Sequence, residues 1–143
     1  MYIFSAFKWT IFLSKIKKRG RDAMFKIFNE NSCGLWVGDC VVRAVSILTD
    51  QNWDDTYMDL ALQGFRMCNM PSANVVWGQY LIDKGYEMYS IKPTTVKEFC
   101  KSHPNGKYLL ATGSHVIAII DGDYYDAWDS GNELIIYYFT KEV

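Results

Sequence analysis

The chain has 143 residues and a formal net charge of −1, and half of its residues are hydrophobic. This length predicts one domain with a sizeable core, and the 16% aromatic content argues against disorder. Because no single-sign charge field dominates, a nucleic-acid partner is not expected. The four cysteines are irregularly spaced, which predicts reduced thiols in a cytoplasm and disfavours a disulfide framework. Cys100 and His103 have a ligand-like gap, but two candidates do not make a four-ligand zinc site.

Residues 1–23 differ in composition from the rest of the chain. Residues 1–13 are apolar and aromatic, and five basic side chains follow. A secretory signal carries its charges before the apolar run, and this run is interrupted by Lys8 and is shorter than the roughly 20 residues that span a bilayer. Two interpretations remain: a basic amphipathic anchor on a membrane surface, or upstream sequence ahead of a start at Met24. The basic run can be encoded entirely by purines, like a ribosome-binding site, which favours the second. Stable membrane insertion is not expected, and the domain is expected over residues 24–143.

Helical periodicity dominates the first half of this domain. A loop over residues 29–38 precedes a helix over about 40–49, for which Asp39 is a suitable N-cap. The spacing of apolar side chains predicts three further helices, one from Trp53 to Phe65, one from Pro71-Ser72 to Gly85, and one capped by Thr94 or Thr95. A short strand over residues 86–91 separates the last two.

Strand patterning dominates the second half. Four runs are predicted as strands, namely 107–112, 115–120, 124–129 and 134–140. Gly122-Asp123 is predicted to join the second and third runs as a tight hairpin, and Gly131-Asn132 to join the third and fourth. Helices followed by an antiparallel meander predict an α+β domain, in which the helices pack on one face of a C-terminal antiparallel sheet.

Cys40 is the candidate nucleophile. It follows Gly38-Asp39 directly and takes the first position of the predicted helix, where unpaired N–H groups and the helix dipole favour negative charge. Such a position lowers a thiol pKa below its ordinary value of about 8.5 and favours the thiolate. The alternative is an inert core residue, since free cysteine is among the most buried residue types. Cys33, Cys68 and Cys100 are interpreted as structural.

His115 is the candidate general base, because it opens a predicted strand directly after Gly113-Ser114. The second histidine, His103, lies before a proline in a polar turn and is interpreted as a surface residue. A third member should accept the other ring N–H of the base and orient its imidazole. If cross-strand pairs are counted outward from the predicted Gly122-Asp123 turn, His115 lies opposite a residue near Ser130, which slightly favours Asp129. Strand twist also allows Asp126, so register alone leaves both open.

Less specific signals concern the oxyanion hole and the substrate cleft. An oxyanion hole would combine the backbone N–H of Cys40 with a side-chain donor, for which Asn29 and Asn31 are candidates. Asparagine in a turn commonly bonds its own backbone instead. Three tryptophans are candidates for lining a cleft, although aromatic residues more often belong to the core: Trp36, Trp77 and Trp128.

Three segments resemble small papain-like cysteine peptidase domains found in gut bacteria and their phages. They are Gly-Asp-Cys-Val-Val-Arg-Ala at 38–44, Ser-His-Val-Ile-Ala-Ile-Ile-Asp-Gly at 114–122 and Tyr-Tyr-Asp-Ala-Trp-Asp-Ser-Gly at 124–131. The resemblance covers nearly all of residues 29–139 and omits the leader. It implies a papain-like α+β fold and thiol-dependent hydrolysis of a peptide or isopeptide bond.

More distantly, the chain is similar to the bacteriocin-leader peptidases attached to ABC exporters, in which a Cys helix is followed by a His-Val strand and a Tyr-x-Asp strand. In that pattern the acid follows a strand aromatic, which corresponds to Asp126, with Ala127 where proline is usual. The resemblance therefore implies that Asp126 forms a triad with Cys40 and His115, and the acid favoured by register becomes the second choice. Those peptidases also carry a glutamine six residues before the cysteine, where Gly34 stands here.

Two alternatives to a cysteine peptidase of this kind stay open. A cell-wall peptide hydrolase of related fold also pairs an Asp-Cys helix start with a His-Val strand, although no export signal is convincing. A catalytically inactive module would keep the fold and bind a partner peptide in its aromatic cleft. In each case the expected partner is a peptide or protein, and no cofactor is expected.

Overall fold

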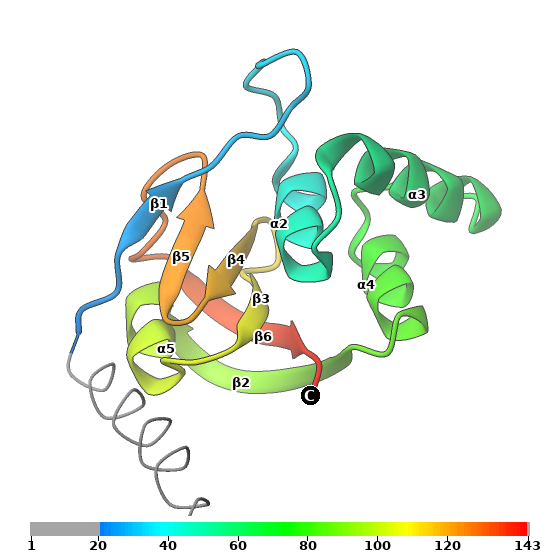
Figure 1. Ribbon diagram of the computed structural model, residues 1–143. Helices are drawn as coiled ribbons and strands as arrows, with labels where there is room; N and C mark the ends of the chain where they lie inside the picture. Colours follow the sequence, from blue (N-terminus) through cyan, green and yellow to red (C-terminus); the bar gives the residue numbers. More distant parts are fainter. Residues whose placement is uncertain (1–20, 143) are drawn as a thin grey trace, which may run out of the picture.

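A six-stranded mixed sheet forms the centre of residues 21–142, the part of the chain that the computed structural model describes (Figure 1). In chain order the elements are β1 (Phe25–Ile27), α2 (Cys40–Thr49), α3 (Trp53–Arg66), α4 (Asn74–Asp83), β2 (Glu87–Thr95), α5 (Val96–Ser102), β3 (Lys107–Ala111), β4 (Val116–Ile120), β5 (Asp123–Asp126) and β6 (Leu134–Thr140). The strand order across the sheet is β1-β5-β4-β3-β6-β2. The predicted α+β class is confirmed for these residues.

Helices α2, α3 and α4 cover one face of the sheet, and α5 lies on the other (Figure 1). The central strands explain this arrangement, because opposed residues of β3 and β4 share a face. Leu109 and its partner Ala118 pack with α2–α4, whereas Leu110 and its partner Ile117 pack with α5. Since both faces of these strands are apolar, both need a cover, and the expectation that all helices pack on one face is wrong for α5.

The sheet is not the antiparallel meander that the turn signals predicted. β6 does not form a hairpin with β5 through Gly131-Asn132 but pairs antiparallel with both β3 and β2. β1 adds a parallel strand beside β5, so the sheet is mixed. The strand expected over residues 86–91 is the longer β2. Its pairing with β6 is interrupted by a register shift between Ser90 and Thr94. These pairings join segments far apart in the chain, which no local turn encodes.

The predicted hairpin between β4 and β5 is present, but its turn residues are Asp121 and Gly122. Their φ angles are 50° and 81°, both in the left-handed region that a two-residue type I′ turn requires. Ile119 therefore lies opposite Tyr124. The expected turn at Gly122-Asp123 is displaced by one residue, and this shifts every cross-strand pair by two.

The predicted leader, residues 1–23, falls mostly outside the described residues, which begin at Arg21. The Arg21 guanidinium lies 2.8 Å from the Asp123 carboxylate, and that carboxylate also accepts the Met24 N–H at 3.1 Å. These contacts attach the start of the described chain to β5, the strand that ends at Asp126. Among residues 21–142, no helix is long and apolar enough to cross a membrane.

Candidate active site

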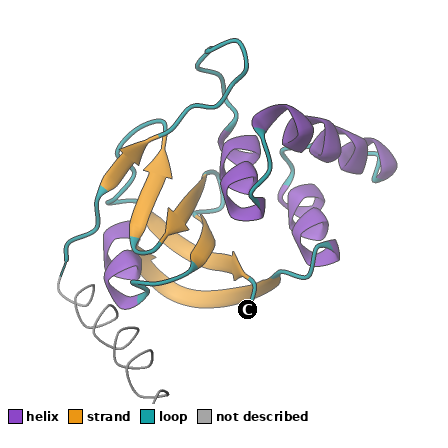
Figure 2. Cartoon of the chain, viewed as in Figure 1, coloured by secondary structure: helices purple, strands orange, loops and turns teal. Residues whose placement is uncertain are grey.

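Cys40 is the first residue of α2, and its side chain is partly buried. The long connection from β1 leads directly into this helix (Figure 2). Val41, Val45 and Leu48 are buried behind it, so the apolar face of α2 holds the helix against β3 and β4. The N–H groups of the first turn of a helix have no intrahelical partner, and they leave a partial positive charge beside the Cys40 sulfur.

Asp39 takes the N-cap position as predicted, but its side chain makes no capping hydrogen bond. The carboxylate is buried and forms an ion pair with Arg43, one helical turn along α2. It also accepts the indole N–H of Trp53 at 2.9 Å, which ties the start of α3 to the start of α2. The backbone of Asp39 therefore starts the helix, while its side chain belongs to a buried polar network.

His115 is placed next to Cys40 by the turn that precedes β4. Its backbone N–H donates to Thr112 Oγ1 at 3.0 Å, and its carbonyl accepts the Thr112 N–H at 2.9 Å. The ring Nε2 lies 2.6 Å from Asp126 Oδ2, and the ring also hydrogen-bonds with the Cys40 thiol. Trp128 stacks on the imidazole with ring centroids 5.2 Å apart. The structure thus brings Cys40, His115 and Asp126 together.

Asp126 is fully buried at the end of β5. Besides His115 it accepts the Ser130 hydroxyl at 2.6 Å, the Ala127 N–H at 2.7 Å and an N–H of Arg43 at 3.0 Å. Burial raises the pKa of this carboxyl, but the hydrogen bonds from His115 and Ser130 outweigh it and lower the pKa below its ordinary value. Asp126 is therefore held as an oriented carboxylate.

The thiol and the imidazole shift each other's pKa in opposite directions. Burial raises the Cys40 pKa, but a hydrogen bond with His115, the backbone N–H of Val116 and the charges of His115 and Arg43 lower it overall. Burial lowers the His115 pKa, whereas hydrogen bonds with Asp126 and Cys40 raise it to about 9. Both shifts favour a thiolate–imidazolium pair near neutral pH.

Asp129, the second choice for the acid, has other partners. Its carboxylate accepts the Tyr124 hydroxyl at 2.5 Å and the Gly131 N–H at 3.1 Å. Continuing the β4–β5 register beyond the paired residues sets His115 opposite Trp128 rather than Ser130. The count that favoured Asp129 thus began from the wrong turn residues.

Arg43 and Ser130 are parts of the site that the sequence reasoning missed. Arg43 is the one charged residue between Cys40 and Thr49 in the sequence, and it lies four residues after Asp39. That spacing places the two side chains on one helix face, and a lone charge in an apolar helix is a signal for a buried ion pair. Nothing in the sequence around Ser130 distinguishes it from an ordinary turn residue.

The two asparagines considered for the oxyanion hole organise the loop instead. Asn31 Oδ1 accepts the N–H groups of Cys33 at 2.9 Å and Leu35 at 3.4 Å. Asn29 donates from its amide to the Leu35 carbonyl at 3.3 Å and accepts the Asn31 N–H at 3.2 Å. The backbone N–H of Cys40, in the first turn of α2, therefore stays the candidate donor for an oxyanion hole, and both asparagines are held in the loop.

Two of the three candidate cleft tryptophans are exposed. Trp36 is 59% exposed and Trp128 is 47% exposed. Because Trp128 stacks on the His115 ring, it can contact a ligand at the site. Trp77 is completely buried in the core and is wrong as a cleft residue.

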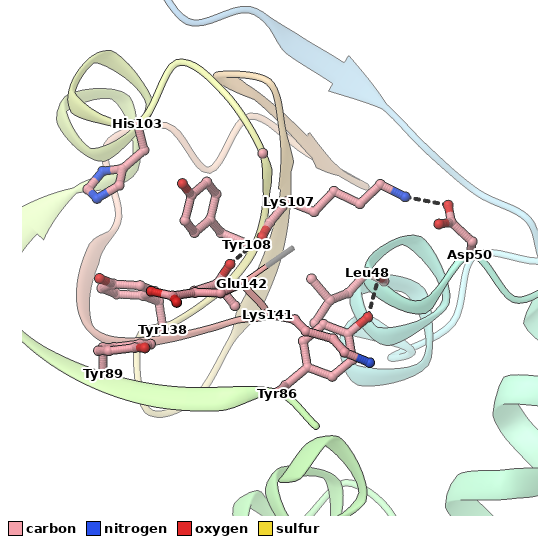
Figure 3. A pocket seen from close by; sticks show the side chains of 12 residues that line it. Leu48, Asp50, Tyr86, Tyr89, His103, Lys107, Tyr108, Tyr138, Lys141 and Glu142 are labelled. Atoms are coloured by element: carbon pink, nitrogen blue, oxygen red, sulfur yellow. Dashed lines mark hydrogen bonds and ion pairs between the residues drawn. The ribbon is translucent and has the colours of Figure 1, made fainter. Parts of the chain in front are cut away.

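A hollow of about 270 Å³ lies between α2 and α3, and residues on both sides of Cys40 line it. A second hollow, of about 710 Å³, lies where α2 ends (Figure 3). Its walls include Leu48, Tyr86 and Tyr138, and an ion pair between Lys107 and Asp50 lies at its edge. Nine residues of helix, or about 14 Å, separate that end of α2 from Cys40, so the larger hollow is not part of this site.

Within residues 21–142 no three His, Cys, Asp or Glu side chains are grouped so as to hold a metal ion. Comparisons with protein-family models, curated proteins and solved structures found no match to this chain. A functional assignment therefore depends on the geometry of the Cys40–His115–Asp126 cluster.

Proposed function

We propose that this chain is a thiol-dependent hydrolase of the cysteine peptidase class. The observation that carries the proposal is the 2.6 Å contact between His115 Nε2 and the fully buried Asp126, together with the hydrogen bond between the Cys40 thiol and the same imidazole. More particularly, we propose a papain-like domain that cleaves a peptide or isopeptide bond with these three residues. A buried thiol without a cationic partner would have a raised pKa, which would suit an inert core residue.

In the acylation step the Cys40 thiolate attacks the carbonyl carbon of the scissile bond and forms a C–S bond. The His115 imidazolium then donates its proton to the departing amine as the C–N bond breaks, leaving a thioester and a neutral imidazole. In deacylation this imidazole takes a proton from water, whose oxygen attacks the thioester carbonyl. The C–S bond breaks, the acid product leaves, and the thiolate–imidazolium pair is restored.

Asp126 and the start of α2 have supporting roles in both steps. The carboxylate accepts the Nε2–H of His115, which fixes the tautomer so that the other nitrogen faces the thiol. It also stabilises the imidazolium that each cycle requires. The backbone N–H of Cys40 and the helix dipole of α2 stabilise the negative oxygen of the tetrahedral intermediates.

Selective alkylation of Cys40 tests the proposal. Cys33 and Cys68 are exposed thiols, so both are first replaced by alanine to give a background in which Cys40 is the accessible cysteine. At pH 6.5 an ordinary thiol, with a pKa of about 8.5, is roughly 1% thiolate and reacts slowly with iodoacetamide. We expect rapid labelling of this background, mapped to Cys40 by mass spectrometry, and its loss in Cys40→Ala.

The matched Cys40→Ala variant should keep the circular dichroism spectrum of the background protein. Equal labelling of the two proteins, or labelling of Cys40 as slow as that of a free thiol, would favour the inactive binding module instead. A peptidoglycan zymogram separates the cell-wall hydrolase from a peptidase acting on protein.

A further inference from the structure

We propose that the outer face of α3 binds a second copy of this chain, with the two α3 helices packed antiparallel. This inference does not depend on the function proposed above. α3 packs against α2 and α4 through one side, on which Thr56, Leu60 and Gly64 are buried. The helix lies at the periphery of the molecule, so its other side faces outward (Figure 1).

The outward side of α3 carries a second apolar stripe. Met58, Leu62 and Phe65 are 65%, 46% and 82% exposed. Their spacing of four and then three residues sets them on one face of the helix, roughly opposite to the buried face. A helix at the surface of a protein ordinarily carries polar residues on its outward side. Three large apolar side chains in a row therefore indicate that this face binds a partner.

The charges at the two ends of α3 favour a second copy as that partner. Asp54 and Asp55 lie in the first turn, and Arg66 lies in the last. Neither Asp54 nor Arg66 forms an ion pair within residues 21–142. In an antiparallel pair the acidic turn of each copy lies beside Arg66 of the other, and two-fold symmetry makes this contact twice. A parallel pair would instead set like charges side by side.

The net charge and the relief of the surface are compatible with this pairing. A formal net charge of −1 leaves little repulsion between two copies. A groove of about 290 Å³ lies between α3 and α4, and its walls include Leu62 and Tyr80. Because residues 58 and 62 lie on either side of the middle of α3, full antiparallel overlap brings Met58 of the second copy close to Leu62, at this groove. Methionine is flexible and fills irregular gaps of this kind.

Sedimentation equilibrium of the full chain tests the proposal. The stripe supplies far fewer residues than the roughly 20–30 a side of a standard interface, so we expect a weak dimer with a Kd on the order of 10–100 µM. The measurement needs a reducing agent because Cys33 and Cys68 are exposed and could form disulfides between copies.

Substitutions within the stripe should weaken the dimer. Phe65→Asp and Met58→Asp each bury an aspartate twice in one dimer, and we expect either to raise the Kd at least tenfold. Met88→Asp is the matched control, because it replaces a methionine of β2 that is 55% exposed, compared with 65% for Met58. It should leave the Kd unchanged. The circular dichroism spectra of all three variants should match that of the wild type, because each change is at an exposed position.

Charge reversal tests the antiparallel alignment. Asp54→Lys alone would set two positive charges together at each end of the pair, and Arg66→Glu alone would set two negative ones. In a mixture of the two variants, both ends of a mixed dimer pair opposite charges. We therefore expect the mixed dimer to be about tenfold tighter than either variant with itself, measured with a fluorescent label on one variant.

A wild-type chain that stays monomeric well above 100 µM, the weak end of the expected range, would overturn the proposal and would point to a different protein as the partner of the stripe. Association that Met88→Asp weakens and that neither Phe65→Asp nor Met58→Asp weakens would overturn it too, since the interface would lie elsewhere. A mixed dimer no tighter than the single-variant dimers would contradict the antiparallel alignment.

Discussion

Arg43 and Asp126 form an ion pair in the interior, with Nη2 3.0 Å from Oδ1 and side-chain exposures of 6% and 0%. The pair connects the helix that carries Cys40 to the strand that carries the acid. Because the other side of the guanidinium binds Asp39, one cation compensates two buried carboxylates. The ion pair thereby holds the start of α2 close to the end of β5. Since Cys40 begins α2 and His115 is bound to Asp126 at the end of β5, it also holds Cys40 close to His115.

Replacing Arg43 by methionine should therefore affect both stability and the thiol. The two buried carboxylates would lose their shared cation, and we expect a loss of about 3–5 kcal/mol in the free energy of unfolding, measured by urea denaturation. The Cys40 pKa should rise because a nearby positive charge is removed.

The double variant Arg43→Met with Asp39→Asn is the control for the unpaired charge. It should recover part of the lost stability while the Cys40 pKa stays high. An Arg43→Met protein within 1 kcal/mol of wild type, a margin smaller than the cost of an unpaired buried charge, would contradict the importance of the network.

Asp126→Asn tests which carboxylate supports the histidine. Asparagine keeps the shape but removes the charge and the strongest acceptor for the His115 ring, so the His115 pKa should fall from about 9. Peptide hydrolysis should fall at least a hundredfold because the imidazole loses its fixed tautomer. NMR titration of the His115 ring protons measures the pKa.

Asp129→Asn, three residues further along the chain, is the matched control. It weakens contacts with Tyr124 and Gly131 and should leave the His115 pKa unchanged. The assignment of Asp126 fails if Asp129→Asn shifts the His115 titration and Asp126→Asn does not.

The hydrolysis rate should depend on pH as a bell. Activity should rise with pH as Cys40 loses its proton, with the midpoint below the ordinary thiol value because the Cys40 pKa is lowered. It should fall again near pH 9, where His115 loses the proton it donates to the leaving amine. In Asp126→Asn the alkaline limb should move to lower pH. Because the thiol and the imidazole interact, both midpoints belong to the Cys40–His115 pair and not to either residue alone. A rate that still rises above pH 10 would exclude His115 as the proton donor to the leaving amine.

The helices were predictable because their signals are local. Apolar spacing and a cap placed α2 over residues 40–49, and the bounds Cys40–Thr49 match. Thr95 caps α5 through a capping box with Glu98, a pattern readable from four residues of sequence. Each of these features depends on neighbours within one or two helical turns.

Sheet order was not predictable in the same way. β6 lies between β3 and β2, and β1 pairs in parallel with β5 across about a hundred residues of chain. Three residues, Phe25–Ile27, are too few to show strand periodicity in the sequence. The hairpin turn is displaced by one residue because Asp121 adopts a positive φ together with Gly122, a conformation that sequence patterns predict mainly for glycine.

At the site, the chemistry-bearing residues were easier to anticipate than their supports. His115 and Asp126 were selected on residue type and resemblance, and they hydrogen-bond to each other; their catalytic roles stay predictions. The side chain of Asp39 was misjudged because capping is a local rule, and the buried Arg43 offered a stronger partner. Such partners depend on which elements pack together.

The pH dependence of Cys40 alkylation by iodoacetamide, in the background lacking Cys33 and Cys68, tests the central claim most directly. We predict an apparent pKa below the ordinary thiol value of about 8.5 in this protein. In His115→Ala the apparent pKa should rise by at least about one unit, roughly a tenfold slower reaction at pH 7, with no change in the control His103→Ala. An apparent pKa of about 8.5 or higher in the wild type, or one that His115→Ala leaves unchanged, would contradict the account.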